Sequence, residues 1–187
     1  MQTAREGAGS KPPRLNAMSR DAARLAPGGE PPASKWTALD SIDRRIVATL
    51  QEEGRITNLE LSNRVGLSAP PCLRRVRALV AAGVIRGFHA DIDPHSLGWH
   101  LTFFAIVELD SQKEEVLSAF EALVAAWPEV RECHMIRGGG DFMLRLVARD
   151  TAHENELTAR LTRAPSVNRV QTLQTIRTSH SVPGVPV

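Results

Sequence analysis

The sequence predicts an α+β protein in which three short helices precede a domain of four strands and two helices. Between residues 39 and 83, apolar residues recur at spacings of three and four, which is typical of amphipathic helices. Between residues 101 and 177, apolar stretches of strand length alternate with helical patterns in the order βαββαβ. That order is the split arrangement of ferredoxin-like domains. We therefore expect an N-terminal winged helix-turn-helix and a C-terminal ferredoxin-like domain.

Changes of composition set the expected domain boundaries. Residues 1–38 are rich in glycine and proline and show no hydrophobic period, which predicts a disordered tail. The helix-turn-helix is expected at residues 39–93 and the ferredoxin-like domain at residues 101–178. A linker at 94–100 joins them, and residues 179–187 should form a frayed tail.

Capping signals define the three N-terminal helices. Asp40 is expected to cap the first helix, and Thr57 with Glu60 forms a capping box for the second. Gly66 suits the left-handed position that ends the second helix, and a third helix follows it. Residues 84–92 then become β-like, as in a short hairpin or wing.

The third helix is the candidate for reading DNA, because a helix of this motif fits the major groove. Leu73, Val76 and Val80 are expected to face the core, which leaves the arginines outside or at the border. Pro70 and Pro71 lack backbone N–H groups, so Ser68 has less capping to do and is free to contact DNA. The candidate DNA-binding residues are Arg55, Asn58, Ser68, Arg74, Arg75 and Arg77.

The distribution of charge supports this reading better than the net charge of +2 does. No acidic residue occurs between Glu60 and Asp91, a stretch that contains five arginines. Such a local cationic stretch is typical of a surface that binds a polyanion. A solvated basic helix face, or a trihelical protein-interaction module, remains the alternative.

A glycine-rich segment, IRGGGDF at residues 136–142, lies between two expected strands. Its glycines permit positive φ angles and close approach of a ligand to the backbone. A carboxylate there can accept hydrogen bonds from an ammonium group, while exposed amides bind a carboxylate. The candidate effector-binding residues are Arg137, Gly138, Gly139, Gly140 and Asp141. The alternative is a flexible hairpin turn in which Asp141 pairs locally, and the segment is not a P-loop.

Other features bear on the class of protein. A second capping box is expected at Thr151 and Glu154, opening the last helix. No apolar run is long enough to span a membrane, and no export signal is evident, so free thiols at Cys72 and Cys133 and a cytoplasmic location are expected. The histidines show no metal spacing and no catalytic motif is present, so we expect no metal, no cofactor and no enzymatic activity.

Four segments in succession resemble the Lrp/AsnC family of feast/famine regulators: LDSIDRRI at 39–46, QEEGRITN at 51–58, LS at 67–68 with PCLRRV at 71–76, and GVIRGF at 83–88. The resemblance covers residues 39–177. It departs at Ala69-Pro70, where relatives often have Pro then Thr, so one hydroxyl contact to DNA is missing.

The resemblance implies a winged helix-turn-helix followed by a βαββαβ effector domain called the RAM domain. It also implies an amino-acid site at the glycine loop, where Gly138 and Asp141 match the family motif best. A four-stranded sheet with helices on one face leaves its other face bare, so pairing with a second copy is expected. The resemblance implies dimers built in this way, which often associate further into octamers. Two-fold symmetry then predicts pseudo-palindromic sites on double-stranded DNA.

The sequence therefore predicts a sequence-specific transcriptional regulator that responds to an amino acid or related metabolite, cytoplasmic and associated with the nucleoid. Two alternatives remain. Some relatives with this plan are tetrapyrrole decarboxylases, and His89, His95 and His100 would be the residues to test. A nucleoid-organising protein, in contrast, would bind DNA broadly through phosphate contacts alone.

Overall fold

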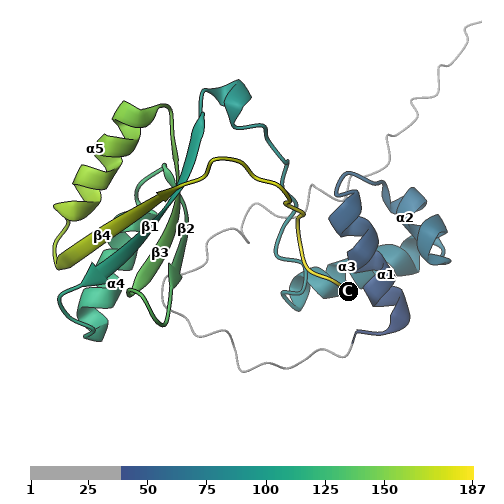
Figure 1. The fold of residues 1–187 in the computed structure, drawn as a ribbon. Helices are drawn as coiled ribbons and strands as arrows, with labels where there is room; N and C mark the ends of the chain where they lie inside the picture. Colours follow the sequence, from purple (N-terminus) through teal and green to yellow (C-terminus); the bar gives the residue numbers. More distant parts are fainter. Residues whose placement is uncertain (1–38) are drawn as a thin grey trace, which may run out of the picture. The chain divides into compact units, whose positions relative to one another are not determined.

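The computed structural model describes residues 39–187, which divide into two compact units (Figure 1). The helical unit contains residues 39–90 together with 182–187, and the sheet unit contains residues 91–181. The tail expected at residues 1–38 lies outside the described residues. No helix within residues 39–187 is long and apolar enough to cross a membrane.

Three helices form the helical unit: α1 (Ser41–Glu52), α2 (Asn58–Val65) and α3 (Ala69–Ala81). Asp40 caps α1, because its carboxylate accepts hydrogen bonds from two backbone N–H groups of the first turn. Thr57 and Glu60 form the predicted capping box of α2. Gly66 ends α2 with a φ of +73°. These local signals are confirmed.

The buried face of α3 differs by one position from the prediction. Cys72, Val76 and Leu79 are buried, whereas Leu73 and Val80 are only partly buried. Both sets share Val76 and have helical spacing, so periodicity cannot separate them. Cys72 determines which face of α3 is buried, because its small apolar side chain packs readily against α1 and α2.

Residues 84–92 form no strand, so the predicted hairpin is wrong. The backbone N–H groups of Val84 and Ile85 both donate to the carbonyl oxygen of Leu79, at 3.0 and 3.2 Å. These bonds satisfy a carbonyl at the C-terminus of α3 that has no partner within the helix. Two donors that a strand ladder would need are therefore already used.

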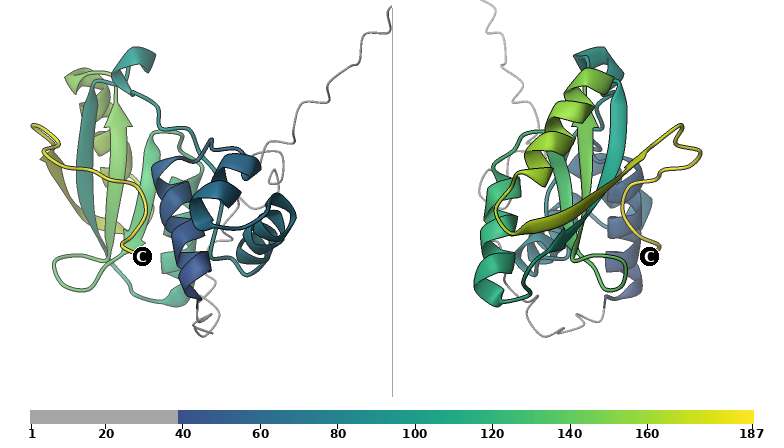
Figure 2. Two further views of the ribbon diagram at one scale, coloured as in Figure 1. Left: turned by 90° about the vertical axis from the view of Figure 1, so that its right-hand side faces the viewer. Right: turned by 60° about the vertical axis from the view of Figure 1, so that its left-hand side comes forward.

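The sheet unit follows the predicted βαββαβ order, with β1 (Leu101–Leu109), α4 (Glu114–Ala125), β2 (Val130–Met135), β3 (Phe142–Ala148), α5 (Thr151–Thr162) and β4 (Val167–Gln174). Neighbouring strands are antiparallel, in the spatial order β2-β3-β1-β4. Figure 2 shows α4 and α5 on the same face of the sheet. This is the expected ferredoxin-like arrangement.

The core of this unit lies between the sheet and its helices. Alternate residues of the two central strands supply it, as the period of two in a strand requires: Phe103, Ala105 and Val107 from β1, and Phe142, Leu144 and Leu146 from β3. Phe120 of α4 packs on Phe142 with 5.0 Å between the ring centroids. The opposite residues of each strand therefore lie on the face without helices.

The start of α5 corrects a prediction. Asp150 is the N-cap, and its carboxylate accepts a hydrogen bond of 2.8 Å from the backbone N–H of His153. Aspartate is at least as good an N-cap as threonine, so it takes the position that the capping box assigned to Thr151. Glu154, which the capping box placed at the helix start, is buried.

The last six residues, 182–187, lie against α1, where we expected a frayed end; we call them the C-terminal segment. The side-chain amide of Gln51 donates to the carbonyl oxygen of Val185 at 3.0 Å and accepts from its backbone N–H at 2.7 Å. Gly184 has a φ of +79°, and a Cβ there would overlap the Gln51 side chain. A paired donor and acceptor thus hold this segment in the helical unit.

Candidate DNA-binding surface and ligand loop

Two arginines of α3 are presented to solvent. Arg74 and Arg77 are exposed, and neither forms an ion pair with another described residue. Arg55, just before α2, is exposed as well. All of α3 lies in the acid-free stretch between Glu60 and Asp91, so no carboxylate of α3 offsets these charges. An exposed guanidinium is suited to bidentate contact with phosphate or guanine.

Arg75 differs from these arginines because two acids at the start of α1 hold it. Its Nη1 lies 2.7 Å from Oδ2 of Asp40 and 2.8 Å from Oδ1 of Asp43. The pKa of Asp40 is lowered, first by the hydrogen bond from the Asp43 N–H and then by that from Arg75. Sequence reasoning grouped Arg75 with the outward residues and assigned Asp40 only to the capping of α1.

The turn between α2 and α3 places two further candidates. Ser68 is the exposed N-cap of α3, and its hydroxyl makes no capping hydrogen bond. Asn58 Nδ2 donates to the carbonyl oxygen of Ala69 at 2.8 Å, while its Oδ1 is buried with no hydrogen-bond partner among the described residues. Asn58 therefore braces α2 against the first residue of α3, and its contact with phosphate stays a prediction.

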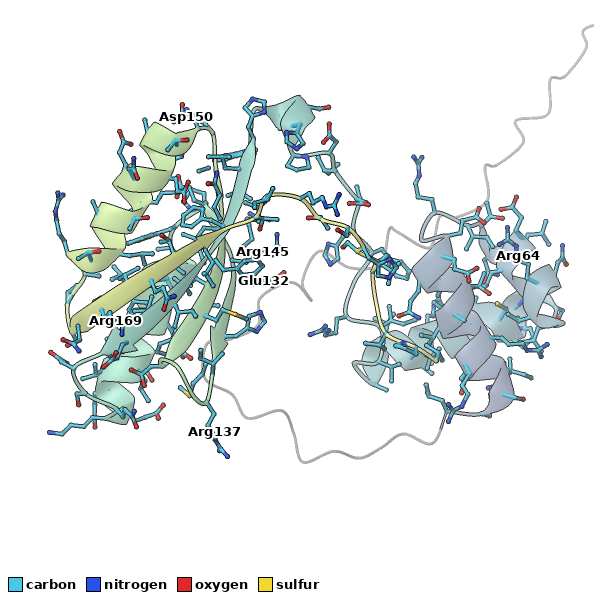
Figure 3. All side chains as sticks on the ribbon, in the orientation of Figure 1. Arg64, Glu132, Arg137, Arg145, Asp150 and Arg169 are labelled. Carbon is cyan, nitrogen blue, oxygen red and sulfur yellow. The ribbon has the colours of Figure 1, made fainter. Side chains whose placement is uncertain are left out.

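The loop between β2 and β3 is closely packed at one end and open at the other. Gly138 and Gly140 have φ angles of +129° and +150°. A Cβ on Gly140 would lie 2.6 Å from Cγ2 of Ile106 and 3.2 Å from the carbonyl oxygen of Val107, whereas Gly138 has open space around it. Arg137 extends from this loop away from the sheet (Figure 3).

Asp141 anchors the loop to the end of β1. Its Oδ2 accepts a hydrogen bond of 2.7 Å from the Leu109 N–H, and its Oδ1 accepts one of 3.1 Å from the side-chain amide of Gln112. Its own N–H donates to the carbonyl oxygen of Val107 at 2.9 Å. Asp141 therefore pairs locally, as expected for the alternative interpretation of this loop as a hairpin turn. Sequence reasoning did not find Leu109 and Gln112, because no motif links them to the loop.

Comparisons with known proteins agree with these two halves. A model described as winged helix-turn-helix DNA-binding matches residues 39–86, and one described as the Lrp/AsnC ligand binding domain matches residues 102–182. The leucine-responsive regulatory protein of Rhizobium meliloti is 49% identical over 140 residues, which is 74% of this chain and 90% of that protein. The chain belongs to the Lrp/AsnC family. The leucine-responsive regulatory protein of Escherichia coli K12 is 42% identical over 135 residues, which is 72% of this chain and 82% of that protein.

Solved structures of Lrp/AsnC regulators have the same fold. A transcriptional regulator from Neisseria meningitidis in complex with L-Met superposes with a TM-score of 0.75 at 33% identity, covering 79% of this chain and 96% of that one. An AsnC family regulator from Agrobacterium tumefaciens gives a TM-score of 0.75 at 30% identity, covering 79% and 97%. This protein is thus a transcriptional regulator with a DNA-binding helix-turn-helix and a small-molecule-binding domain.

In this Lrp/AsnC ligand-binding domain, the sheet face opposite α4 and α5 combines apolar and charged side chains. Phe104 and Ile106 alternate with the buried residues of β1 and so lie on that face. At β2 and β3, Glu132 Oε1 lies 2.6 Å from Nη2 of Arg145, and Figure 3 shows the two side chains together. The pKa of Glu132 is lowered, chiefly by the hydrogen bond from Arg145.

The remaining chemistry-bearing side chains of this regulator are dispersed. Within residues 39–187, no three His, Cys, Asp or Glu residues gather in a way that could hold a metal ion. His95 and His100 approach each other with 3.3 Å between their Nδ1 atoms, and His89 lies outside this pair. Cys72 and Cys133 are free thiols.

Proposed function

We propose that this regulator binds operator DNA through α3 and senses a free amino acid at the loop of residues 136–141. The observation that supports DNA contact is the pair of exposed arginines, Arg74 and Arg77, on a helix without acidic residues. In this proposal they reach base edges and phosphates in the major groove, while Arg55 and Ser68 contact the flanking backbone.

The open part of the loop suits an α-amino acid. The backbone N–H groups of Gly138 and Gly139, together with Arg137, can receive the carboxylate of the ligand. Among residues 39–187, Asp141 Oδ1 accepts only from the exposed side chain of Gln112, so a ligand ammonium group can replace that amide while Oδ2 keeps its bond to β1. The relative from Neisseria meningitidis binds L-Met, which favours an amino acid with an apolar side chain.

A second copy of the chain is the proposed cover of the open sheet face. Phe104 and Ile106 would be shielded from water there, as the burial of apolar surface favours. Two-fold symmetry would place two α3 helices on half-sites about one helical turn, or a multiple of it, apart. We propose that such dimers assemble further, up to octamers, and act in the cytoplasm on the nucleoid without any catalytic step.

A gel-shift titration tests the DNA half of the proposal. The probe is DNA from beside the protein's own gene, with an unrelated fragment as competitor. The Arg74→Ala/Arg77→Ala variant should lose the specific complex, because each good bidentate contact carries roughly 1–3 kcal/mol of base discrimination. Arg163→Ala, which removes an exposed arginine in the sheet unit, is the control and should bind normally. Equal binding of both fragments would indicate a broad nucleoid binder instead.

Calorimetry with L-leucine, L-methionine and L-alanine tests the effector half. Asp141→Asn keeps the shape of the side chain but removes the charge that an ammonium group requires, so amino-acid binding should weaken at least tenfold, as expected of a charge-assisted hydrogen bond worth about 1.5–3 kcal/mol. Asp110→Asn, at an exposed residue, is the matched control. Normal binding by Asp141→Asn would contradict the assigned role of this residue.

A further inference from the structure

Arg75 joins the start of α1 to the middle of α3. Its guanidinium is held by Asp40 and Asp43, which lie 35 and 32 residues earlier in the chain. Its side chain is 33% exposed, and that of Asp43 is 20% exposed. The contact is therefore partly shielded from water, unlike an ion pair on an open surface. It is a tertiary contact between two helices rather than a local pairing within one.

The two carboxylates are held in fixed positions. Asp40 is the N-cap of α1, where Oδ1 accepts the N–H groups of Ile42 and Asp43 at 2.9 and 2.8 Å, and this leaves Oδ2 for Arg75. Asp43 lies in the first turn of the same helix. Nη1 of Arg75 donates to both carboxylates, and its two N–H groups have fixed directions in the guanidinium plane, so this bridge restricts both the rotation and the position of α3 relative to α1.

The same contacts make Arg75 a poor candidate for direct contact with DNA. Its one positive charge faces two negative charges, so the three residues together carry a net charge of −1. Both carboxylates bind Nη1, so a phosphate that approached the rest of the guanidinium would lie beside two negative charges that outweigh the positive charge of Arg75. Arg74 and Arg77 have no such partner among residues 39–187.

We propose that Arg75 is a positioning residue, which with Asp40 and Asp43 orients α3 so that Arg74 and Arg77 meet the DNA. Two acidic residues then support DNA binding despite their charge. The inference rests on the proposed use of α3 as the DNA-reading helix. It predicts that removing a negative charge weakens specific binding, the opposite of what electrostatics alone predicts.

The test measures affinity for operator and unrelated DNA at several salt concentrations, using the full-length protein. Asp43→Asn should weaken operator binding by roughly two- to fivefold, the range expected from loss of a partly exposed ion pair. Binding to unrelated DNA should not weaken, and the number of phosphate contacts, measured as the salt dependence, should stay unchanged, because no phosphate contact is lost. Glu53→Gln, which removes the partner of Arg64, is the control and should not weaken operator binding.

A double-mutant cycle separates positioning from direct contact. Arg75→Gln and Asp43→Asn together should cost no more than Arg75→Gln alone, because Arg75→Gln already removes the interaction that Asp43→Asn removes. If Arg75 instead touched phosphate, Arg75→Gln would reduce the salt slope by about one, and Asp43→Asn would tighten binding. Either result overturns the inference.

One further variant, Arg74→Gln, keeps the outcomes distinct. If Arg75→Gln does not fold, Asp43→Asn still tests the role of Arg75, because asparagine is close in shape to aspartate and should leave the fold intact. Arg74→Gln should weaken operator binding whether Arg75 positions α3 or contacts DNA directly. If Arg74→Gln binds normally, the proposed use of α3 fails. If Arg74→Gln weakens binding and Asp43→Asn strengthens it, only the role assigned to Arg75 fails.

Discussion

Three successive glycines of the ligand loop should respond very differently to alanine, because the structure places each in a different environment. Gly139 has no positive φ and nothing within 4 Å of an added Cβ, so Gly139→Ala should change the free energy of unfolding by less than about 0.5 kcal/mol. Gly138 has equal space but a φ of +129°. Gly138→Ala should therefore cost about 1–3 kcal/mol from backbone strain alone.

Gly140→Ala adds a steric term to a similar backbone strain. Its Cβ would press on Ile106 and on the carbonyl oxygen of Val107, which also accepts the hydrogen bond from the Asp141 N–H. Overpacking of this kind costs about 1–3 kcal/mol. Weakening the hydrogen bond costs roughly 1 kcal/mol more. We therefore expect a total of about 3–7 kcal/mol, which is at least about 2 kcal/mol beyond Gly138→Ala.

Urea unfolding followed by tryptophan fluorescence measures this difference, because Trp127 is buried in the sheet unit. With a slope of about 1.5 kcal/mol per M, a difference of 2 kcal/mol lowers the midpoint by roughly 1.3 M. The expected order of stability is Gly139→Ala, then Gly138→Ala, then Gly140→Ala. Equal midpoints for Gly138→Ala and Gly140→Ala would show that β1 shifts to accommodate the added methyl group without lowering the free energy of unfolding. That result would refute the steric argument.

Three other expectations concern single side chains. Desolvation by neighbouring groups, with a contribution from Glu121, raises the pKa of Cys133 to about 11, although the residue itself is exposed. At pH 8 this thiol should therefore react with a disulfide reagent roughly two hundredfold slower than an ordinary thiol, and a normal rate would contradict the raised pKa. Gln51→Ala removes both hydrogen bonds to Val185, so hydrogen exchange of the Val185 amide should accelerate several-fold. An unchanged exchange rate would show that these bonds do not hold the C-terminal segment on α1. The pKa of Glu132 is lowered, so its pairing stabilises the fold above pH 4.5, and this stabilisation is lost as the pH falls through the lowered pKa. The free energy of unfolding in urea should therefore exceed that of Glu132→Gln by less at pH 3.5 than above pH 4.5. The same difference at both pH values would argue against this role of Glu132.

Local signals predicted most of the secondary structure. The caps at Asp40 and Thr57 depend on residues within one helical turn, so they can be read from the sequence. The errors arose where two local signals compete. Asp150 and Thr151 are both good N-caps, and the sequence does not say which one the chain selects. On α3, apolar residues at neighbouring positions left the buried face ambiguous by one position.

The candidate sites were less predictable, because their geometry depends on contacts between distant segments. Arg75 was grouped with the outward arginines, yet its partner Asp40 lies 35 residues away. Asp141 was chosen for its motif, but its bond to Leu109 spans 32 residues and uses a backbone N–H that no side-chain pattern reveals. Periodicity and capping describe one element at a time, and such contacts require the assembled fold.

The contact between Gln51 and Val185 has a consequence for the synthesis of the protein. Its two partners lie 134 residues apart, so at about 5–20 residues per second the ribosome adds Val185 roughly 7–27 s after Gln51. Domains generally fold as they are synthesised, N-terminal first. The helical unit of this regulator can form its contact with Val185 only after that residue has been synthesised, although its three helices are made early. An affinity tag placed after Val187 would begin directly on the surface of α1.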